Sequence, residues 1–316
     1  MPSFSNLPVS PADVDAAATR IAGRVHHTPL LTCSTLDEVV GATFRAKAEH
    51  LQRAGSFKIR GALNRILQLT ADEAGRGVVA FSSGNHAQAV ALAARLRGVR
   101  ATIVMPSDAP IVKLAATRGY GATVVEYDRG TQDRVALAAA IADRLGSVLI
   151  PPFNDVDVIA GQGTVGREVV EEWPDVEVAV IPVGGGGLIS GMALALKRSN
   201  PRIRVIGVEP EMADDARRSL AAGEIITIAQ PHTIADGVAT TALGSLTFPI
   251  MRELVDEIVT VSEDEIRDAV RFIATRMKQL VEPTGALTTA ALLHHRVANI
   301  DRRNVLTVLC GGNADL

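Results

Sequence analysis

Short runs of apolar, β-branched residues alternate with alanine-rich amphipathic segments along most of this chain. That alternation is typical of βαβ units, in which parallel strands are covered by helices on both faces. It predicts an α/β fold. We expect strands over 78–81, 101–105, 123–126, 147–150, 178–183, 204–208, 257–261 and 305–309, and helices over 86–97, 111–117, 132–145, 164–173, 188–198, 263–280 and 284–295.

The double proline Pro151-Pro152 is the clearest boundary within the pattern. The segment before it forms a compact strand–helix set of its own, and the pattern resumes after it. A length of 316 residues also suits about two domains. We therefore expect a large domain over 1–74 and 151–316, with a smaller, mobile domain over 75–150 inserted into it. A cleft between two such units is the expected ligand site.

Composition excludes several classes of protein. The net charge is −3 and 21% of the residues are charged, with no basic stripe, so nucleic acid is not an expected partner. No apolar run reaches the roughly 18 residues that span a membrane, and Met1–Pro11 does not resemble a secretion signal. Two cysteines are too few for a disulfide framework. These features favour a cytoplasmic α/β enzyme.

Two polar segments stand out in this apolar context. Lys58 lies among apolar neighbours in Ser56–Ala62, where desolvation would lower its pKa and free a nucleophilic amine, although a solvated surface lysine is the commoner case. Ser82-Ser83-Gly84-Asn85-His86 joins an expected strand to a helix and suits a carboxylate or phosphate. An ordinary helix cap is the alternative, but a cap needs only one such residue.

The four glycines Gly184, Gly185, Gly186 and Gly187 are the strongest single motif. They follow an expected buried strand, precede a helix, and cost conformational entropy. They make sense where the backbone wraps an anion at a helix N-terminus. By contrast, Gly161–Gly166 spells G-x-G-x-x-G but follows no clear strand, and no acidic residue lies about 20 positions on. A nicotinamide enzyme is therefore disfavoured.

Cys310-Gly311-Gly312-Asn313 follows the last expected strand, at the sheet edge where α/β proteins bind ligands. Cys310 is a candidate catalytic thiol, although a small buried residue is the more common interpretation.

Together these segments resemble the serine/threonine dehydratase and serine racemase family, pyridoxal phosphate enzymes of fold type II with the tryptophan synthase β-like architecture. The resemblance extends from Thr28-Pro29-Leu30 to Asn313, with the motifs in the family's order and spacing. Because it occupies nearly the whole chain, we expect no appended regulatory domain and no isoleucine feedback through one.

The resemblance implies a role for each motif residue. Lys58 is implied to carry the cofactor covalently and to exchange the Cα proton of the substrate. The implied cofactor contacts are Phe57 against the ring, Asn85 on the 3′-oxygen, Gly184–Gly187 around the phosphate, and Cys310 at the ring nitrogen. The implied substrate-binding residues are Ser82, Ser83, Asn85, His86, Arg134 and Thr241, and Ser83 is also the implied second base of a racemase.

The resemblance also implies a cation site and a homodimer. Glu209, the Ala213 carbonyl and Asp215 match the family's divalent-cation loop, and their oxygen ligands suit Mg²⁺ or Ca²⁺. An acid-rich helix N-terminus explains the same residues nearly as well. Two departures from the family pattern, Ala87 for Gly and Cys310 for the more usual Ser, leave elimination chemistry undisturbed but weaken the case for racemisation.

The function implied is an L-threonine/L-serine dehydratase, an ammonia-lyase that gives a 2-oxo acid and ammonia by α,β-elimination. A serine racemase, or a bifunctional racemase and dehydratase, is one alternative, because Ser83 is present. A 3-hydroxyaspartate dehydratase is another, because Arg134 could bind a second carboxylate. An amino-acid sensor without catalysis is disfavoured by the presence of Lys58.

Overall fold

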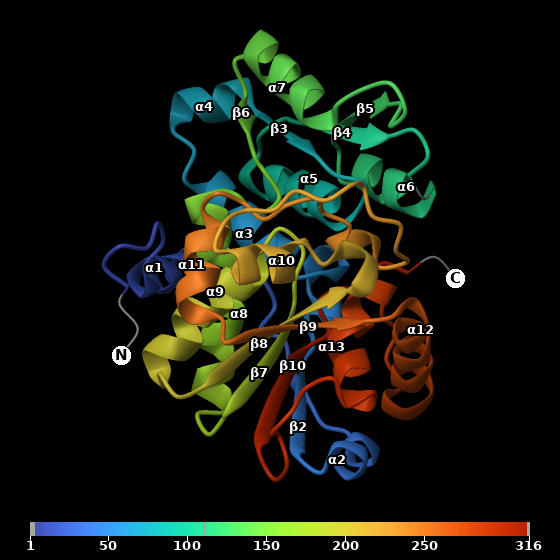
Figure 1. Cartoon of the computed structure of the whole chain (residues 1–316). Helices are drawn as coiled ribbons and strands as arrows, with labels where there is room; N and C mark the ends of the chain where they lie inside the picture. Colours follow the sequence, from blue (N-terminus) through green and yellow to red (C-terminus); the bar gives the residue numbers. More distant parts are fainter. Residues whose placement is uncertain (1–3, 110, 315–316) are drawn as a thin grey trace.

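The computed structural model describes residues 4–109 and 111–314. It contains two β-sheets, each covered by helices, and Figure 1 shows the smaller sheet and its helices lying above the larger. No helix among the described residues is long and apolar enough to cross a membrane.

The larger sheet has six strands in the order β1-β2-β10-β7-β8-β9. All its neighbouring strands are parallel except β1, which pairs antiparallel with β2. The central strands are apolar and buried on both faces, as a parallel sheet with helices on both sides requires. The strands are β1 (Leu30–Leu31), β2 (Thr43–Lys47), β7 (Val178–Pro182), β8 (Arg204–Pro210), β9 (Glu257–Val261) and β10 (Asn304–Val308).

Two separate hydrophobic cores lie on the faces of this sheet. One packs α1, α8, α9 and α11 against it, and the other packs α2, α12 and α13. The helices of this unit are α1 (Pro11–Ile21), α2 (Ser34–Val40), α3 (Lys58–Leu67), α8 (Val156–Glu172), α9 (Gly187–Ser199), α10 (Asp215–Ala222), α11 (Thr247–Leu254), α12 (Glu263–Phe272) and α13 (Pro283–Leu293). Short 3₁₀ turns occur at η1 (Glu49–Leu51), η2 (Arg53–Gly55), η3 (Glu211–Ala213) and η4 (Asp236–Val238), and a short π-helix at η5 (Ile273–Met277).

The smaller sheet is parallel throughout, in the order β5-β4-β3-β6. Its strands are β3 (Val78–Phe81), β4 (Ala101–Pro106), β5 (Thr123–Tyr127) and β6 (Val148–Leu149), and its helices are α4 (Ala71–Arg76), α5 (Asn85–Arg97), α6 (Ile111–Gly119) and α7 (Arg134–Leu145). The α/β fold with two parallel-sheet units is therefore confirmed. The domain boundaries at 74/75 and 150/151 stay a prediction, and the end residues 1–3 and 315–316 lie outside the described residues.

Two expected helices differ from those of the structure by more than two residues at one end. The helix expected from residue 164 begins at Val156, because Asp155 caps it by accepting from two backbone amides. In the segment expected to be helical to residue 280, the α-helix ends at Phe272. The short π-helix η5 follows, and it ends at Lys278, which has a positive φ of 56°. The periodicity of the sequence predicts neither the earlier start of α8 nor the π-helix that follows α12.

The G-x-G-x-x-G segment lies inside α8 and is a packing device. A Cβ on Gly161 would lie 2.6 Å from Cα of Gly61 in α3, and one on Gly163 would lie 2.7 Å from the Gly191 carbonyl in α9. The glycines therefore let three helices cross at close range. The segment therefore lies within a helix, whereas a dinucleotide fingerprint lies between a strand and a helix.

Candidate active site

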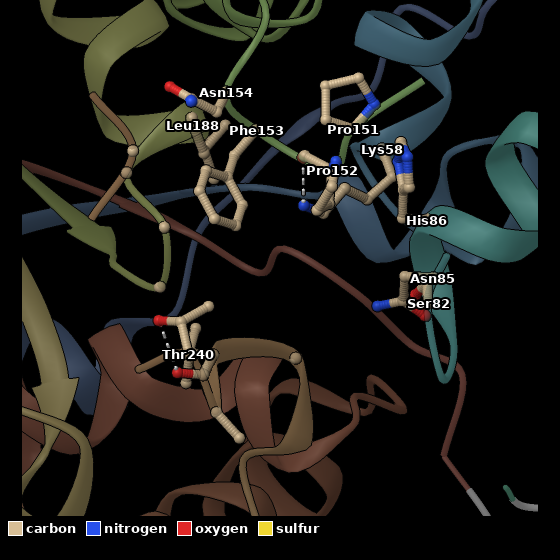
Figure 2. Close-up of a pocket in the computed structure, with 18 of the residues that line it drawn as sticks. Lys58, Ser82, Asn85, His86, Pro151, Pro152, Phe153, Asn154, Leu188 and Thr240 are labelled. Atoms are coloured by element: carbon tan, nitrogen blue, oxygen red, sulfur yellow. Dashed lines mark hydrogen bonds between the residues drawn. The ribbon is translucent and has the colours of Figure 1, made fainter. Parts of the chain in front are cut away.

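A cavity of about 600 Å³ opens between the two sheet units. It collects every predicted cofactor- and substrate-contacting residue into one site. Those lining residues are Phe57, Lys58, Ser82, Ser83, Asn85, His86, Arg134, Gly184, Gly185, Gly186, Gly187, Thr241 and Cys310. Figure 2 shows Lys58 beside His86 and facing Pro152, with Ser82 and Asn85 close by.

Lys58 is the first residue of α3, and its side chain reaches into the cavity. Its Nζ donates to the carbonyl of Pro152 at 3.0 Å, and Figure 2 draws this hydrogen bond as the dashed line beside the Pro152 label. Desolvation by burial lowers the pKa of this amine to about 8, while the nearby Glu282 carboxylate opposes that shift. At pH 7 about a tenth of the amine is then uncharged and nucleophilic, far more than for a solvated lysine.

The Ser82–His86 turn connects β3 to the N-terminus of α5. Gly84 occupies the N-cap position and supplies no side-chain cap to the first amides of the helix. Uncapped amides at a helix N-terminus are suited to an anion. His86 is buried and donates from Nε2 to the Ile150 carbonyl, and desolvation with the Lys58 charge lowers its pKa to about 3. His86 is therefore neutral.

The glycine loop has the shape of an anion cradle at the start of α9. Gly186 has a φ of +89° and, like Gly84, gives its helix no side-chain cap. A Cβ on Gly185 would clash with the ring of Phe153, so no larger residue fits there. These residues fit a phosphate group, because a loop of glycines at a helix N-terminus lets backbone amides approach an anion in the cavity that the loop lines.

Cys310 follows β10 and is buried at the floor of the cavity. Its Sγ donates to the Thr284 carbonyl at 3.5 Å. Burial and the charge of Glu282 raise the pKa of the thiol well above its usual range, although Lys58 acts in the opposite direction. The thiol is therefore neutral, which suits a contact to a ring nitrogen and does not suit a catalytic thiolate.

Several residues of the site are missed by sequence reasoning. Phe57 is the one aromatic that the sequence predicts near the cofactor, but Phe81 and Phe153 also line the cavity. Lys113 and Asp236 line it as well, and they form an ion pair at 2.7 Å. Phe153 lies next to the proline pair, a signal that could have drawn attention to it. Nothing in the sequence connects Lys113 with Asp236, since 123 residues separate them.

The predicted cation ligands lie outside this cavity, where β8 ends and α10 begins. Both carboxylate oxygens of Asp215 are buried without a hydrogen-bond partner among the described residues. Glu209 accepts from the amides of Ala216 and Arg217, and burial together with the Asp215 charge raises its pKa well above the usual value. Two buried carboxylates, one of them unpartnered, fit a divalent cation. No three acid, imidazole or thiol side chains converge among the described residues, and the predicted set contains only two.

Comparison with known proteins defines the class to which this fold and cavity belong. The chain belongs to the family described as pyridoxal-phosphate dependent enzymes, whose model matches residues 21–311. The fold is that of its fold type II members.

Within that family, the L-threo-3-hydroxyaspartate ammonia-lyase of Saccharomyces cerevisiae is 47% identical over 96% of this chain and 93% of its own. The L-threonine ammonia-lyase of Thermotoga maritima is 45% identical over 96% of this chain and 75% of its own. Among solved structures, the serine racemase of maize has a TM-score of 0.94 and 41% identity, covering 98% of this chain and 94% of its own.

Proposed function

We propose that this protein is a pyridoxal-phosphate-dependent ammonia-lyase that converts L-threonine and L-serine to a 2-oxo acid and ammonia. One observation carries the proposal: an amine with a lowered pKa, Lys58, lies in one cavity with a four-glycine loop and two helix N-termini that have no side-chain cap. The relatives named ammonia-lyases support the same class of reaction.

The residues of the cavity have separate tasks in this proposal. Gly184–Gly187 hold the cofactor phosphate, Asn85 and Cys310 contact its ring, and Phe57 packs beside it. When bound, pyridoxal phosphate supplies an electron sink for the bond that breaks at Cα.

The other residues of the cavity bind the substrate and transfer its proton. The Ser82–His86 turn binds the α-carboxylate, and Lys58 removes the Cα proton as general base. The β-hydroxyl gains a proton and leaves as water, which balances the proton taken from Cα. Hydrolysis of the resulting unsaturated amino acid then gives the 2-oxo acid and ammonia. We propose that the unit over 75–150 moves as a small domain and excludes water during these steps.

A steady-state screen tests this function. Serine, threonine and 3-hydroxyaspartate are offered as both enantiomers, and 2-oxo acid, ammonia and D-serine are measured. Ammonia release from L-threonine or L-serine is the expected result. D-serine formed faster than pyruvate would favour the racemase, with Ser83 as second base. No product from any substrate would favour a non-catalytic sensor.

A 3-hydroxyaspartate lyase is a second candidate, and Arg134 favours it. Arg134 begins α7 and lines the cavity, with its guanidinium 6.0 Å from the ring centre of Phe81. Among the described residues it has no carboxylate partner within ion-pair distance, so its charge is available to a second substrate carboxylate.

Replacing Arg134 with alanine tests that second candidate. We expect kcat/KM for 3-hydroxyaspartate to fall about tenfold or more, since a charge-assisted hydrogen bond is lost, while the value for threonine changes by less than about threefold. Arg144→Ala, at the exposed far end of the same helix, is the control. Equal losses for both substrates would contradict a role for Arg134 in substrate choice.

We propose that Glu209, Asp215 and the Ala213 carbonyl bind Mg²⁺ or Ca²⁺. Either ion, at saturation, should raise the melting temperature by about 3 °C or more. Asp215→Asn should abolish this shift and, in EDTA, should melt no lower than wild type, because the variant removes an unpartnered buried charge. The exposed Asp264→Asn should keep the shift. A full shift in Asp215→Asn would contradict the site.

A homodimer and a cytoplasmic location also stay predictions. The family resemblance supports the homodimer, and the composition of the chain supports the location. Analytical ultracentrifugation measures the first directly.

A further inference from the structure

Glu282 is a buried carboxylate next to the cavity, and the roles proposed so far do not use it. It precedes α13 and is 1% exposed. Its Oε1 accepts a hydrogen bond from Nδ2 of Asn85, and a Cβ on Gly311, the neighbour of Cys310, would clash with the same oxygen. Oε2 has no hydrogen-bond partner among the described residues. Burying a carboxylate that has one unpartnered oxygen costs folding free energy, which a functional role for Glu282 would offset.

Asn85 is held at both ends of its amide. Nδ2 donates to Glu282, and Oδ1 accepts from Nδ2 of Asn313 at 2.9 Å. Nδ2 of Asn313 also donates to the Ala54 carbonyl, four residues before Lys58. An amide nitrogen carries two hydrogens. With one hydrogen directed at Glu282, the second is free for an acceptor in the cavity.

Two charged residues from different elements act electrostatically on the Glu282 carboxylate. Lys113 of α6 lies 3.8 Å from Oε2 and 2.7 Å from Oδ2 of Asp236 in η4. Lys113 belongs to the smaller sheet unit, whereas Asp236 and Glu282 belong to the larger. The ion pair therefore joins the two units beside the cavity, and both of its charges act on the Glu282 carboxylate.

We propose that Glu282 is a positioning residue that holds the Asn85 amide with its second hydrogen directed at the cofactor, and that Lys113 and Asp236 set the charge of Glu282. The inference rests on the proposed function, because Asn85 contacts the cofactor only there.

The electrostatics of Glu282 support this proposal. Its pKa is raised to about 7, chiefly by burial and also by Asp236, while Lys113, Asn85 and Lys58 act to lower it. The neutral Cys310 thiol also lies beside it. Glu282 therefore changes charge near neutral pH. Lys113 lowers the pKa of this change and Asp236 raises it.

The first test uses cofactor binding. Each protein is stripped of cofactor and titrated with pyridoxal phosphate, and the visible absorption of the complex is recorded. Glu282→Ala should weaken binding about tenfold, as loss of a charge-assisted hydrogen bond does. Glu282→Gln keeps an oxygen that accepts from Asn85 and should remain within about threefold of wild type. The double variant Glu282→Ala/Asn85→Ala should bind like Asn85→Ala alone, because the two residues act as one unit.

Glu265→Gln is the control, since Glu265 is also buried but pairs with Arg296 away from the cavity. Binding by Glu282→Ala as tight as by Glu265→Gln would overturn the proposal, and so would additive effects in the double variant. Failure of the wild type to bind pyridoxal phosphate would instead overturn the proposed function.

The second test measures the absorption of the bound cofactor against pH. Wild type should show a transition near neutral pH that Glu282→Gln abolishes. Lys113→Met should move the midpoint to higher pH and Asp236→Asn to lower pH, because the first removes a cation and the second an anion near Glu282. A purely structural role for Glu282 leaves this transition unchanged in all three variants. That result would overturn the proposal.

Discussion

Replacing Lys58 with arginine should lower the rate of ammonia release by about 10³-fold or more. Arginine keeps the positive charge and most of the volume, but it does not lose its proton near neutral pH. The variant therefore lacks both the nucleophilic amine and the general base that the site provides. Among the described residues, the one other lysine that lines the cavity is Lys113, which is paired with Asp236.

Ammonia release is measured at saturating substrate and pyridoxal phosphate. Lys278→Arg, at an exposed lysine, is the matched control and should keep wild-type turnover. The pKa of Lys58 adds a second readout in the cofactor-free protein. Amine-directed labelling of Lys58 should accelerate as pH rises through about 8, because the uncharged fraction grows. Wild-type turnover by Lys58→Arg would exclude the proposed chemistry.

Replacing Arg60 with alanine should lower the free energy of unfolding by about 3–5 kcal/mol. Arg60 is fully buried on α3, two residues after Lys58. Its guanidinium binds both oxygens of Glu49, each at 2.8 Å, and both oxygens of Glu168, at 2.6 and 2.8 Å. Glu49 is itself fully buried, so the variant leaves it unpaired in the interior.

Urea denaturation measures this loss. Arg65→Ala is the control on the same helix, because Arg65 pairs with Asp155 near the surface and such pairs contribute about 1 kcal/mol or less. Arg60→Lys keeps a charge but not the two-sided geometry, so an intermediate loss is expected. A loss for Arg60→Ala no larger than that for Arg65→Ala would show that the buried network does not stabilise α3.

Local patterns predicted the strand–helix alternation and the main parts of the site. Gly184–Gly187 and Ser82–His86 each lie between a strand and a helix, so their chemistry can be inferred from sequence order alone. The resemblance to a known family places these two segments in one site with Lys58 and Cys310. All of these residues line one cavity in the structure.

The remaining features depend on contacts between distant parts of the chain. The glycines of α8 carry a familiar motif, but their purpose is visible only beside Gly61 and Gly191. Lys113 and Glu282 are separated by 169 positions and resemble ordinary surface charges in the sequence. Their burial follows from the packing of one sheet unit against the other, which no local pattern records.

Lys58 should bind pyridoxal phosphate covalently through its amine. The protein is incubated with the cofactor, reduced with borohydride and digested, and the modified peptide is sequenced by mass spectrometry. We expect a phosphopyridoxyl group on Lys58 and an unmodified Lys278. A label absent from Lys58, or found equally on exposed lysines, would contradict covalent binding at Lys58.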